Sequence, residues 1–178
     1  MLASAACAAY RKFLFWLGRR WWFNWLGPRV FAPLDTWLYP RVHGAVVSAG
    51  PPVLPLLMLT TWGRQSGRAR AVPLLYLQRD DALLVVASNW GRASHPAWSA
   101  NLLANPEGVV QLGVASRPVT AHLLTAEEKA RLWPELCRLC PVWQSYADRS
   151  GRELRVFSLR APGSLPSLQN LNGSSPAH

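Results

Sequence analysis

Two short stretches contain most of the residues whose types and spacing could do chemistry. Residues 59–70 read LTTWGRQSGRAR, and residues 87–102 read ASNWGRASHPAWSANL. In the first stretch two glycines allow the backbone to aim consecutive N–H groups into one concavity, while Ser66 adds a hydroxyl and Arg64, Arg68 and Arg70 add guanidinium groups. The pattern predicts a loop that holds an anion, with phosphate as the obvious guest. A solvated basic hairpin loop is the alternative.

The second stretch predicts another site that favours anions. Ser88 and Asn89 end an apolar run, and a helix is expected to open at His95-Pro96, where free N–H groups and partial positive charge attract anions. Both stretches could therefore face one cleft. Trp98 and Asn101 are three residues apart and share a helix face. Taken alone, however, the tryptophan is typical of a core residue, and the serine is typical of a hydroxyl that caps a strand.

Composition limits the classes of protein that need to be considered. The chain has 178 residues, half of them apolar, which suits one domain with a real core. Its formal charge of +10 indicates an acidic ligand, nucleic acid or an anionic membrane surface. Three cysteines fit a reducing compartment, so cytoplasm is the default. Cys137 and Cys140 lack a second Cys or His pair at zinc-like spacing, and no metal site is predicted.

Residues 1–45 are predicted to form a basic helical arm. They contain five of the ten tryptophans, and their only acidic residue is Asp35. The apolar runs are shorter than the ~20 residues that a membrane span needs, and no cleavage site for secretion follows. Two interpretations remain open: the arm lies in an anionic membrane interface, or it packs over the rest of the protein and its ligand.

Residues 46–161 are predicted to form a single α+β domain made mainly of strands. Short runs rich in Val and Leu, separated by turn residues, predict mostly antiparallel strands near 54–61, 70–78, 82–88, 107–113, 116–124 and 153–160. Six strands with inserted helices suit a small closed or half-closed β-barrel, because closure removes exposed edges. Residues 162–178 are polar and rich in Pro, Gly and Ser, and are predicted to be a disordered tail.

Two helices are expected between the strands. The first covers Pro96 to Ala104 and stops before Pro106, because a residue that precedes proline avoids the helical region. The second starts at Thr125 with the spacing of a capping box, and Pro134 is expected to kink or end it near Trp133. The residues that follow, including Trp143 and Tyr146, are expected to lie in turns.

Four runs of the sequence together resemble the deazaflavin-dependent nitroreductase family, also called the F420-dependent nitroreductase or quinone reductase family. They are TTWGRQSGRARAVPLLY, VVASNWGRASHPAWSANLLANP, ARLWP and SGRELRVF, within a region from about Arg20 to Arg160. The resemblance implies a split β-barrel of the FMN-binding kind. It also implies binding of coenzyme F420, an 8-hydroxy-5-deazaflavin whose phosphate and oligoglutamyl tail are anionic.

The resemblance also implies residue roles. The phosphate and tail would lie on one loop, the deazaflavin ring on the end of one strand, and the other side of the coenzyme on a helix. These three sets are Arg64, Gln65, Ser66, Gly67, Arg68, Ala69 and Arg70; then Val86, Ala87, Ser88 and Asn89; then Ala97, Trp98, Ser99, Ala100 and Asn101. Trp143 and Tyr146 fall where aromatic residues cover the acceptor. Three positions depart from the family pattern: Gln65 replaces a lysine, and Leu75 and Trp143 replace tyrosines.

The sequence thus predicts an oxidoreductase that passes a hydride from C5 of reduced F420 to a quinone, an enone or a nitroaromatic. Ser88 would hydrogen-bond the ring or acceptor, Tyr146 would donate to the developing oxyanion, and Trp143 would complete the acceptor pocket. The predicted partners are this small acceptor and, through the arm, the inner face of the cell membrane; a homodimer is a further candidate, and nucleic acid is not expected. The alternatives are an FMN- or haem-related split barrel and a non-enzymatic basic membrane-binding protein.

Overall fold

The computed structural model describes Trp16, which is helical, and residues 54–163. Most of the predicted basic arm, residues 1–45, and nearly all of the predicted tail, residues 162–178, therefore lie outside the described residues. The division of the chain at residues 46 and 162 stays a prediction.

Six strands form a closed barrel in the described part of the chain. They are β1 (Leu56–Trp62), β2 (Ala69–Arg79), β3 (Ala82–Val86), β4 (Glu107–Leu112), β5 (Ala115–Leu123) and β6 (Val156–Arg160). Their order around the barrel is β1-β2-β3-β6-β5-β4, and every neighbouring pair, including β1 with β4, is antiparallel. Each predicted strand corresponds to an observed one, with ends that differ by up to three residues.

The strands alternate between two apolar clusters because successive side chains point to opposite faces. Leu83, Val85 and Phe157 fill the interior, whereas Leu84 and Val156 contribute to a second cluster outside the barrel. In β2, Tyr76 packs against the interior cluster and Leu75 against clusters on the outer face. These two neighbours therefore point to opposite faces of the strand.

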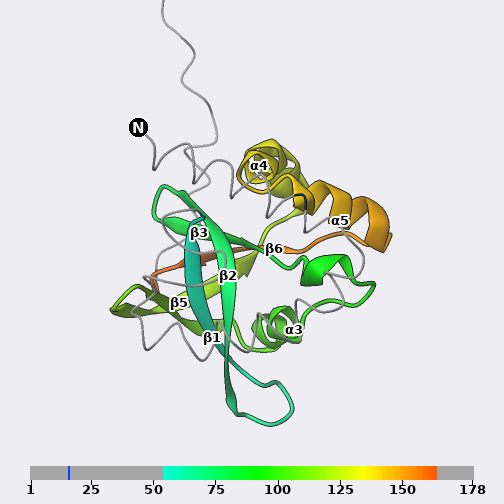
Figure 1. Ribbon diagram of the computed structural model, residues 1–178. Coiled ribbons are helices and arrows are strands. Elements are labelled where there is room, and N and C mark those ends of the chain that lie inside the picture. Colours follow the sequence, from blue (N-terminus) through cyan, green and yellow to red (C-terminus); the bar gives the residue numbers. More distant parts are fainter. Residues whose placement is uncertain (1–15, 17–53, 164–178) are drawn as a thin grey trace, which may run out of the picture.

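Three α-helices accompany the barrel in the described residues: α3 (Ala97–Ala104), α4 (Ala126–Leu139) and α5 (Val142–Ser150). Figure 1 shows α4 and α5 together at one side of the barrel and α3 beside β1. The capping box of α4 forms as predicted, because the Glu128 N–H donates to Thr125 Oγ1 and the Thr125 N–H donates to Glu128 Oε2. β3 is buried along its whole length because α4 and α5 cover its outer face.

Two expectations about the segment after residue 125 are wrong: an end of α4 near Trp133, and turns around Trp143 and Tyr146. Pro134 does not end α4, which continues to Leu139. Pro134 is exposed, so the carbonyl that it leaves without a helical partner can be hydrated, while buried Leu132 and Leu136 on the other face hold the helix against the barrel. Trp143 and Tyr146 lie on α5 and not in turns. Their spacing places both on one buried helix face.

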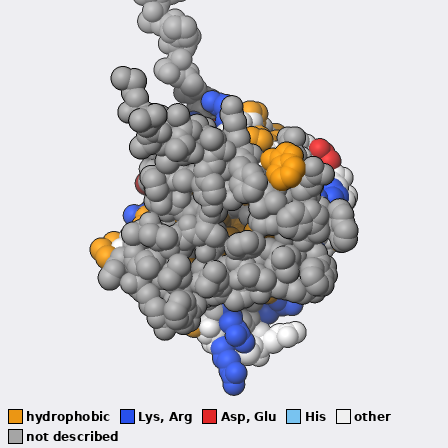
Figure 2. Space-filling model, in the orientation of Figure 1, with side chains coloured by type: hydrophobic (Ala, Val, Ile, Leu, Met, Phe, Trp, Pro, Cys, Tyr) orange, Lys and Arg blue, Asp and Glu red, His pale blue; other side chains and the backbone are white. Residues whose placement is uncertain are grey.

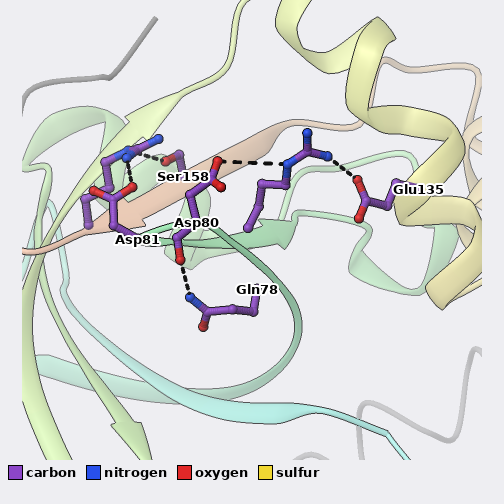
Figure 3. Close-up of polar contacts among 7 residues, drawn as sticks. Gln78, Asp80, Asp81, Glu135 and Ser158 are labelled. Atoms are coloured by element: carbon purple, nitrogen blue, oxygen red, sulfur yellow. Dashed lines mark hydrogen bonds and ion pairs between the residues drawn. The ribbon is translucent and has the colours of Figure 1, made fainter. Parts of the chain in front are cut away.

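The acidic turn between β2 and β3 carries its own ion pairs, as Figure 3 shows. Asp80 has a left-handed φ of 52°, and Gln78 Nε2 donates to its carbonyl oxygen at 2.8 Å. Arg79 pairs with Glu135 at 2.6 Å, and Arg160 pairs with Asp81. The 11 residues of β2 separate this turn from the β1–β2 loop by about 33 Å. The basic loop therefore lies far from these carboxylates.

Candidate functional site

The β1–β2 loop, residues 63–68, folds back on itself. The Gly63 N–H donates to the Arg68 carbonyl at 2.9 Å, and the Gly67 N–H donates to the Gly63 carbonyl at 2.7 Å. Gly67 has a φ of 63°, a region that suits glycine. Arg68 donates its N–H to Ser66 Oγ at 3.4 Å. These three N–H groups are used inside the loop and are not offered to a ligand. Residues 64–68 are all exposed, so the side chains of Arg64, Gln65, Ser66 and Arg68 are accessible. That the loop holds an anion stays a prediction.

Asn101 on α3 fixes the start of this loop. Its Nδ2 donates to Thr61 Oγ1 at 3.1 Å, and its Oδ1 accepts from the Arg64 N–H at 3.1 Å. Asn101 and Thr61 are both buried, which makes each of these bonds costly to lose. The side chain of Asn101 is thus engaged inside the protein, and it acts on the basic loop by holding the backbone of Arg64.

The other predicted residues of α3 divide into buried and accessible ones. Trp98 lies in the barrel core, where its ring is 5.6 Å from that of Phe157. Ser99 is fully buried and donates to the Pro96 carbonyl at 2.9 Å, while Arg155 donates to Ser99 Oγ at 3.4 Å. Ala97 is exposed and Ala100 is half-buried. A ligand on this side would meet the alanines and the backbone of α3.

The segment after β3 has an unusual backbone. Val86 and Ala87 are buried, and Ser88 is half-buried where the strand ends. A short 3₁₀ turn, η1 (Asn89–Gly91), follows, in which all three residues have left-handed φ angles of 47°, 57° and 70°. Such a conformation costs roughly 1–3 kcal/mol for each residue other than glycine, and it is frequent at functional sites. Asn89 Nδ2 donates to the Ser94 carbonyl at 2.8 Å and closes the segment.

Two arginines that the sequence did not single out hold this segment. Arg149 Nη2 donates to the Trp90 carbonyl at 2.8 Å, and Arg152 donates to the carbonyls of Ala87, Ser88 and Arg92 at 3.2, 2.8 and 3.0 Å. The only available signal was the run SGRELRVF, which carries the family resemblance and contains Arg152 but gives it no role. The bonded residues are 59 to 65 positions apart, and no local pattern reports such contacts.

Trp143 and Tyr146 lie in the apolar cluster between the helices and the outer face of the barrel, 4% and 6% exposed. Tyr146 packs against η1: a Cβ on Gly91 would come within 2.8 Å of Tyr146 Cδ1. The guanidinium carbon of Arg149 lies over the Tyr146 ring, 5.1 Å from its centre. Burial raises the pKa of Tyr146, so the phenol keeps its proton at neutral pH. The group can donate a hydrogen bond and cannot act as a base there.

Positive charge accumulates around these elements without carboxylates to balance it. In residues 54–163 no salt bridge links a carboxylate to any of seven arginines around the two predicted stretches; these are Arg64, Arg68, Arg70, Arg92, Arg149, Arg152 and Arg155. Partial burial, Arg155 and Arg152 lower the pKa of His95. Figure 2 shows Lys and Arg side chains at the lower edge of the molecule, where Figure 1 places the β1–β2 loop. This end of the protein suits an anionic ligand.

The described residues offer neither a cluster of metal ligands nor a membrane-spanning helix. Residues 54–163 and Trp16 contain no group of three or more His, Cys, Asp or Glu side chains arranged for a metal ion. None of the helices formed by these residues is long and apolar enough to cross a membrane.

The barrel and its basic end define a split β-barrel protein, which confirms the predicted fold. A solved structure described as an F420-H2 dependent reductase is 34% identical to this chain, with a TM-score of 0.55, and the match covers 60% of this chain and 94% of that one. Another, described as a domain-swapped dimer, is 32% identical with a TM-score of 0.56, and the match covers 72% and 99%.

Comparison of the sequence gives the family. Residues 33–161 match the model of the F420H(2)-dependent quinone reductase family, and the chain belongs to this family. A putative F420H(2)-dependent quinone reductase of Mycobacterium tuberculosis is 41% identical over 95 residues, which are 53% of this chain and 75% of that protein. A second such reductase of M. tuberculosis is 33% identical over 119 residues, 64% and 77% of the two chains. The predicted class, an oxidoreductase that uses F420H2 and a quinone, is confirmed at the level of the family.

Proposed function

We propose that this chain binds F420 by its anionic tail at the β1–β2 loop and by its ring at the segment after β3. The observation that carries the proposal is the set of arginines around these two elements without carboxylate partners in the described residues. Arg64, Arg68 and Arg70 are exposed and offer guanidinium forks to phosphate and glutamyl carboxylates. The residues present therefore fit the coenzyme of the family.

Bound deazaflavin supplies a hydride from a carbon atom, C5, which makes it a two-electron carrier. The protein then has three tasks: to hold the ring, to hold the quinone against it, and to provide the proton that accompanies the hydride. The backbone of Val86, Ala87, Ser88 and Asn89 would lie along the ring. Ser88 is half-buried at the strand end and would hydrogen-bond the ring or the acceptor. Tyr146, protonated at neutral pH, would donate to the acceptor oxygen.

The test is a reduction assay with the full chain. F420H2 and menadione are mixed with the protein, and the return of the fluorescence of oxidised F420 is followed. Protein-dependent oxidation that requires the quinone supports the proposal. Parallel titrations with FMN and with haem address the alternative coenzymes, and binding of either one in place of F420 would overturn it. An enone and a nitroaromatic in place of menadione test the wider acceptor range, which we include in the proposal.

We expect Arg64→Ala to weaken F420 binding by about 1–3 kcal/mol, toward the lower end because the side chain is exposed. The affinity of the parent protein should also fall as salt is added, because ionic contacts at the surface are screened. Fluorescence titration with long-tailed coenzyme and with the tail-less chromophore measures both effects. Arg117→Ala is the matched control, since Arg117 is an exposed arginine on β5. If the two variants lost the same affinity for F420, the proposal that the tail binds at the β1–β2 loop would be wrong.

Two further partners belong to the proposal: an anionic membrane at the cytoplasmic face, contacted by residues 1–45, and a second copy of the chain. The support is the basic, tryptophan-rich sequence of the arm and the relative described as a domain-swapped dimer. Full-length protein should sediment with anionic vesicles, and deletion of roughly the first 25 residues should abolish this. Light scattering of the same preparations gives the molar mass. Protein that stays in the supernatant would favour an arm packed on the barrel.

A further inference from the structure

All three guanidinium nitrogens of Arg152 contact one segment of the chain, residues 87–95. Its Nε donates to the Arg92 carbonyl at 3.0 Å, and its Nη2 donates to the carbonyls of Ala87 and Ser88 at 3.2 and 2.8 Å. Its Nη1 lies 3.0 Å from Nδ1 of His95. Because arginine only donates, this ring nitrogen accepts, and His95 is neutral with its proton on Nε2. One side chain thus ties the first and last parts of the segment together.

Other bonds also contribute to the shape of the segment: Arg149 Nη2 donates to the Trp90 carbonyl and Asn89 Nδ2 donates to the Ser94 carbonyl, both at 2.8 Å. Each of these bonds reaches one or two residues of the segment, whereas Arg152 contacts four. Within the segment, the Gly91 N–H donates to the Ser88 carbonyl at 3.0 Å and the Arg92 N–H donates to the Asn89 carbonyl at 3.1 Å. These short-range bonds enclose three consecutive left-handed residues, two of which are not glycine. Arg152 forms no salt bridge with a carboxylate of the described residues, and the neighbouring acid, Glu153, pairs with Lys129. The guanidinium is therefore left entirely to the carbonyls and the imidazole.

A lysine at position 152 could not make these contacts at the same time. Its ammonium is a compact group with three donors on a flexible stem, whereas the guanidinium is a planar fork with five donors. The three nitrogens of Arg152 each contact a different acceptor: Nε contacts the Arg92 carbonyl, Nη1 the imidazole of His95 and Nη2 the Ser88 carbonyl. Charge alone would be retained by lysine, but the simultaneous contact with both ends of the segment would be lost.

We propose that Arg152 is a positioning residue that sets residues 87–95, and with them Ser88, in the conformation that receives the deazaflavin ring. It acts through the backbone of this segment and has no part in the tail site at residues 63–68. The proposal has two parts. The functional part, that Arg152 prepares the segment for the deazaflavin ring, rests on the proposed function. The structural part, that the conformation of the segment depends on the guanidinium, does not depend on any coenzyme.

Hydrogen–deuterium exchange of the ligand-free full chain tests the structural part. In Arg152→Gln the amides of residues 87–95 should exchange at least tenfold faster than in the parent, while those of residues 63–68 stay unchanged. Arg152→Lys should show the same change, because its charge does not substitute for the fork. Arg138→Gln, which removes an exposed arginine of α4, is the matched control. Unchanged exchange in both Arg152 variants would overturn the proposal. If Arg152→Gln fails to fold, Arg152→Lys alone decides by the same measurement.

Rescue by free guanidinium separates a positioning role from general damage. Arg152 lines an open cavity of about 370 Å³ between α4 and the segment that leads into β6, together with Trp133 and Leu154. This cavity gives a small cation access to the space that Arg152→Ala leaves. Guanidinium, well below denaturing concentrations, should restore slow exchange in Arg152→Ala, and an equal concentration of ammonium should not. Rescue by neither, or by both equally, would contradict the fork geometry.

Coenzyme binding and turnover test the functional part. Arg152→Lys should lose about 10²-fold in kcat, the size of effect expected when a reacting group is misplaced by about 1 Å. It should weaken long-tailed and tail-less coenzyme by the same factor, so that the ratio of their affinities is kept, whereas Arg64→Ala should reduce that ratio. Loss of the ratio in Arg152→Lys would mean that Arg152 binds the tail directly. If the parent chain bound no F420, the proposed function would be wrong, and the exchange experiment would still test the structural part of the proposal.

Discussion

We expect Tyr146→Phe to bind F420 as the parent protein does while its kcat with a quinone falls by between 10² and 10⁴, the usual value of a positioned proton donor. The ring would still pack against Gly91 and lie beneath Arg149, whose guanidinium is 5.1 Å from the ring centre. Only the phenolic hydroxyl is removed. Stopped-flow turnover and fluorescence titration of the same preparation separate the loss of kcat from any loss of affinity.

The pH dependence follows from the burial of this phenol. Burial raises the pKa of Tyr146 above its ordinary value near 10. An acid whose pKa is raised keeps its proton to higher pH, so ionisation of Tyr146 should not reduce kcat between neutral pH and pH 10. A decline in kcat over that range that disappears in Tyr146→Phe would mean that the phenol ionises below pH 10, which would contradict the raised pKa and not the donor role. Such a decline that persists in the variant belongs to another group.

Two comparison variants make the Tyr146 result specific. Tyr76→Phe removes a phenolic hydroxyl from β2, outside the proposed site, and should turn over like the parent. Ser88→Ala removes the other candidate donor. Wild-type turnover in Tyr146→Phe together with an inactive Ser88→Ala would move the donor role to the serine, and Tyr146 would then be a wall of the pocket. Leu75, which stands where the family pattern has tyrosine, packs on the outer face of the barrel and supplies no donor.

The barrel was predictable because its signals are local. Alternating apolar residues mark the strands, the pair Asp80-Asp81 marks the β2–β3 turn, and Thr125 with Glu128 marks the start of α4. The same local rules fail at Pro134, because packing of the buried face of α4 outweighs the lost hydrogen bond on its exposed face. They also fail for α5, whose nine residues form a helix that two buried aromatic side chains hold against the barrel.

The candidate site was predictable only in part. Linear motifs identify the basic loop and the segment around Ser88, since each lies within a dozen neighbouring residues. They do not reveal that Asn101 holds the Arg64 backbone from 37 residues away, or that Arg152 reaches carbonyls as far as 65 residues away. They also do not reveal the pairing of Gly63 with Arg68, which appears only when the chain turns back on itself. Long-range hydrogen bonds to backbone carbonyls have no counterpart in sequence spacing.

The second large effect is expected on stability, from Phe157→Ala. Phe157 is 1% exposed near the start of β6, paired in register with Val85 of β3 and Leu123 of β5. Truncation removes the ring and leaves a cavity, which costs about 3–5 kcal/mol in a packed core. The midpoint of urea unfolding should therefore fall sharply with an unchanged slope. Val114→Ala, at a 74% exposed position in the β4–β5 turn, should stay within about 0.5 kcal/mol of the parent.

Truncation of Phe157 should also affect the β1–β2 loop. The ring of Phe157 packs against Trp98, and Trp98 and Asn101 lie one turn apart on α3. If truncation shifts α3, the two bonds by which Asn101 holds Thr61 and Arg64 should weaken, and amides at the start of the loop should exchange faster. We expect this increase in Phe157→Ala at temperatures where the variant is still folded. A variant that loses less than about 1 kcal/mol, with unchanged exchange in the loop, would mean that the Trp98–Phe157 contact neither supports the core nor positions the loop.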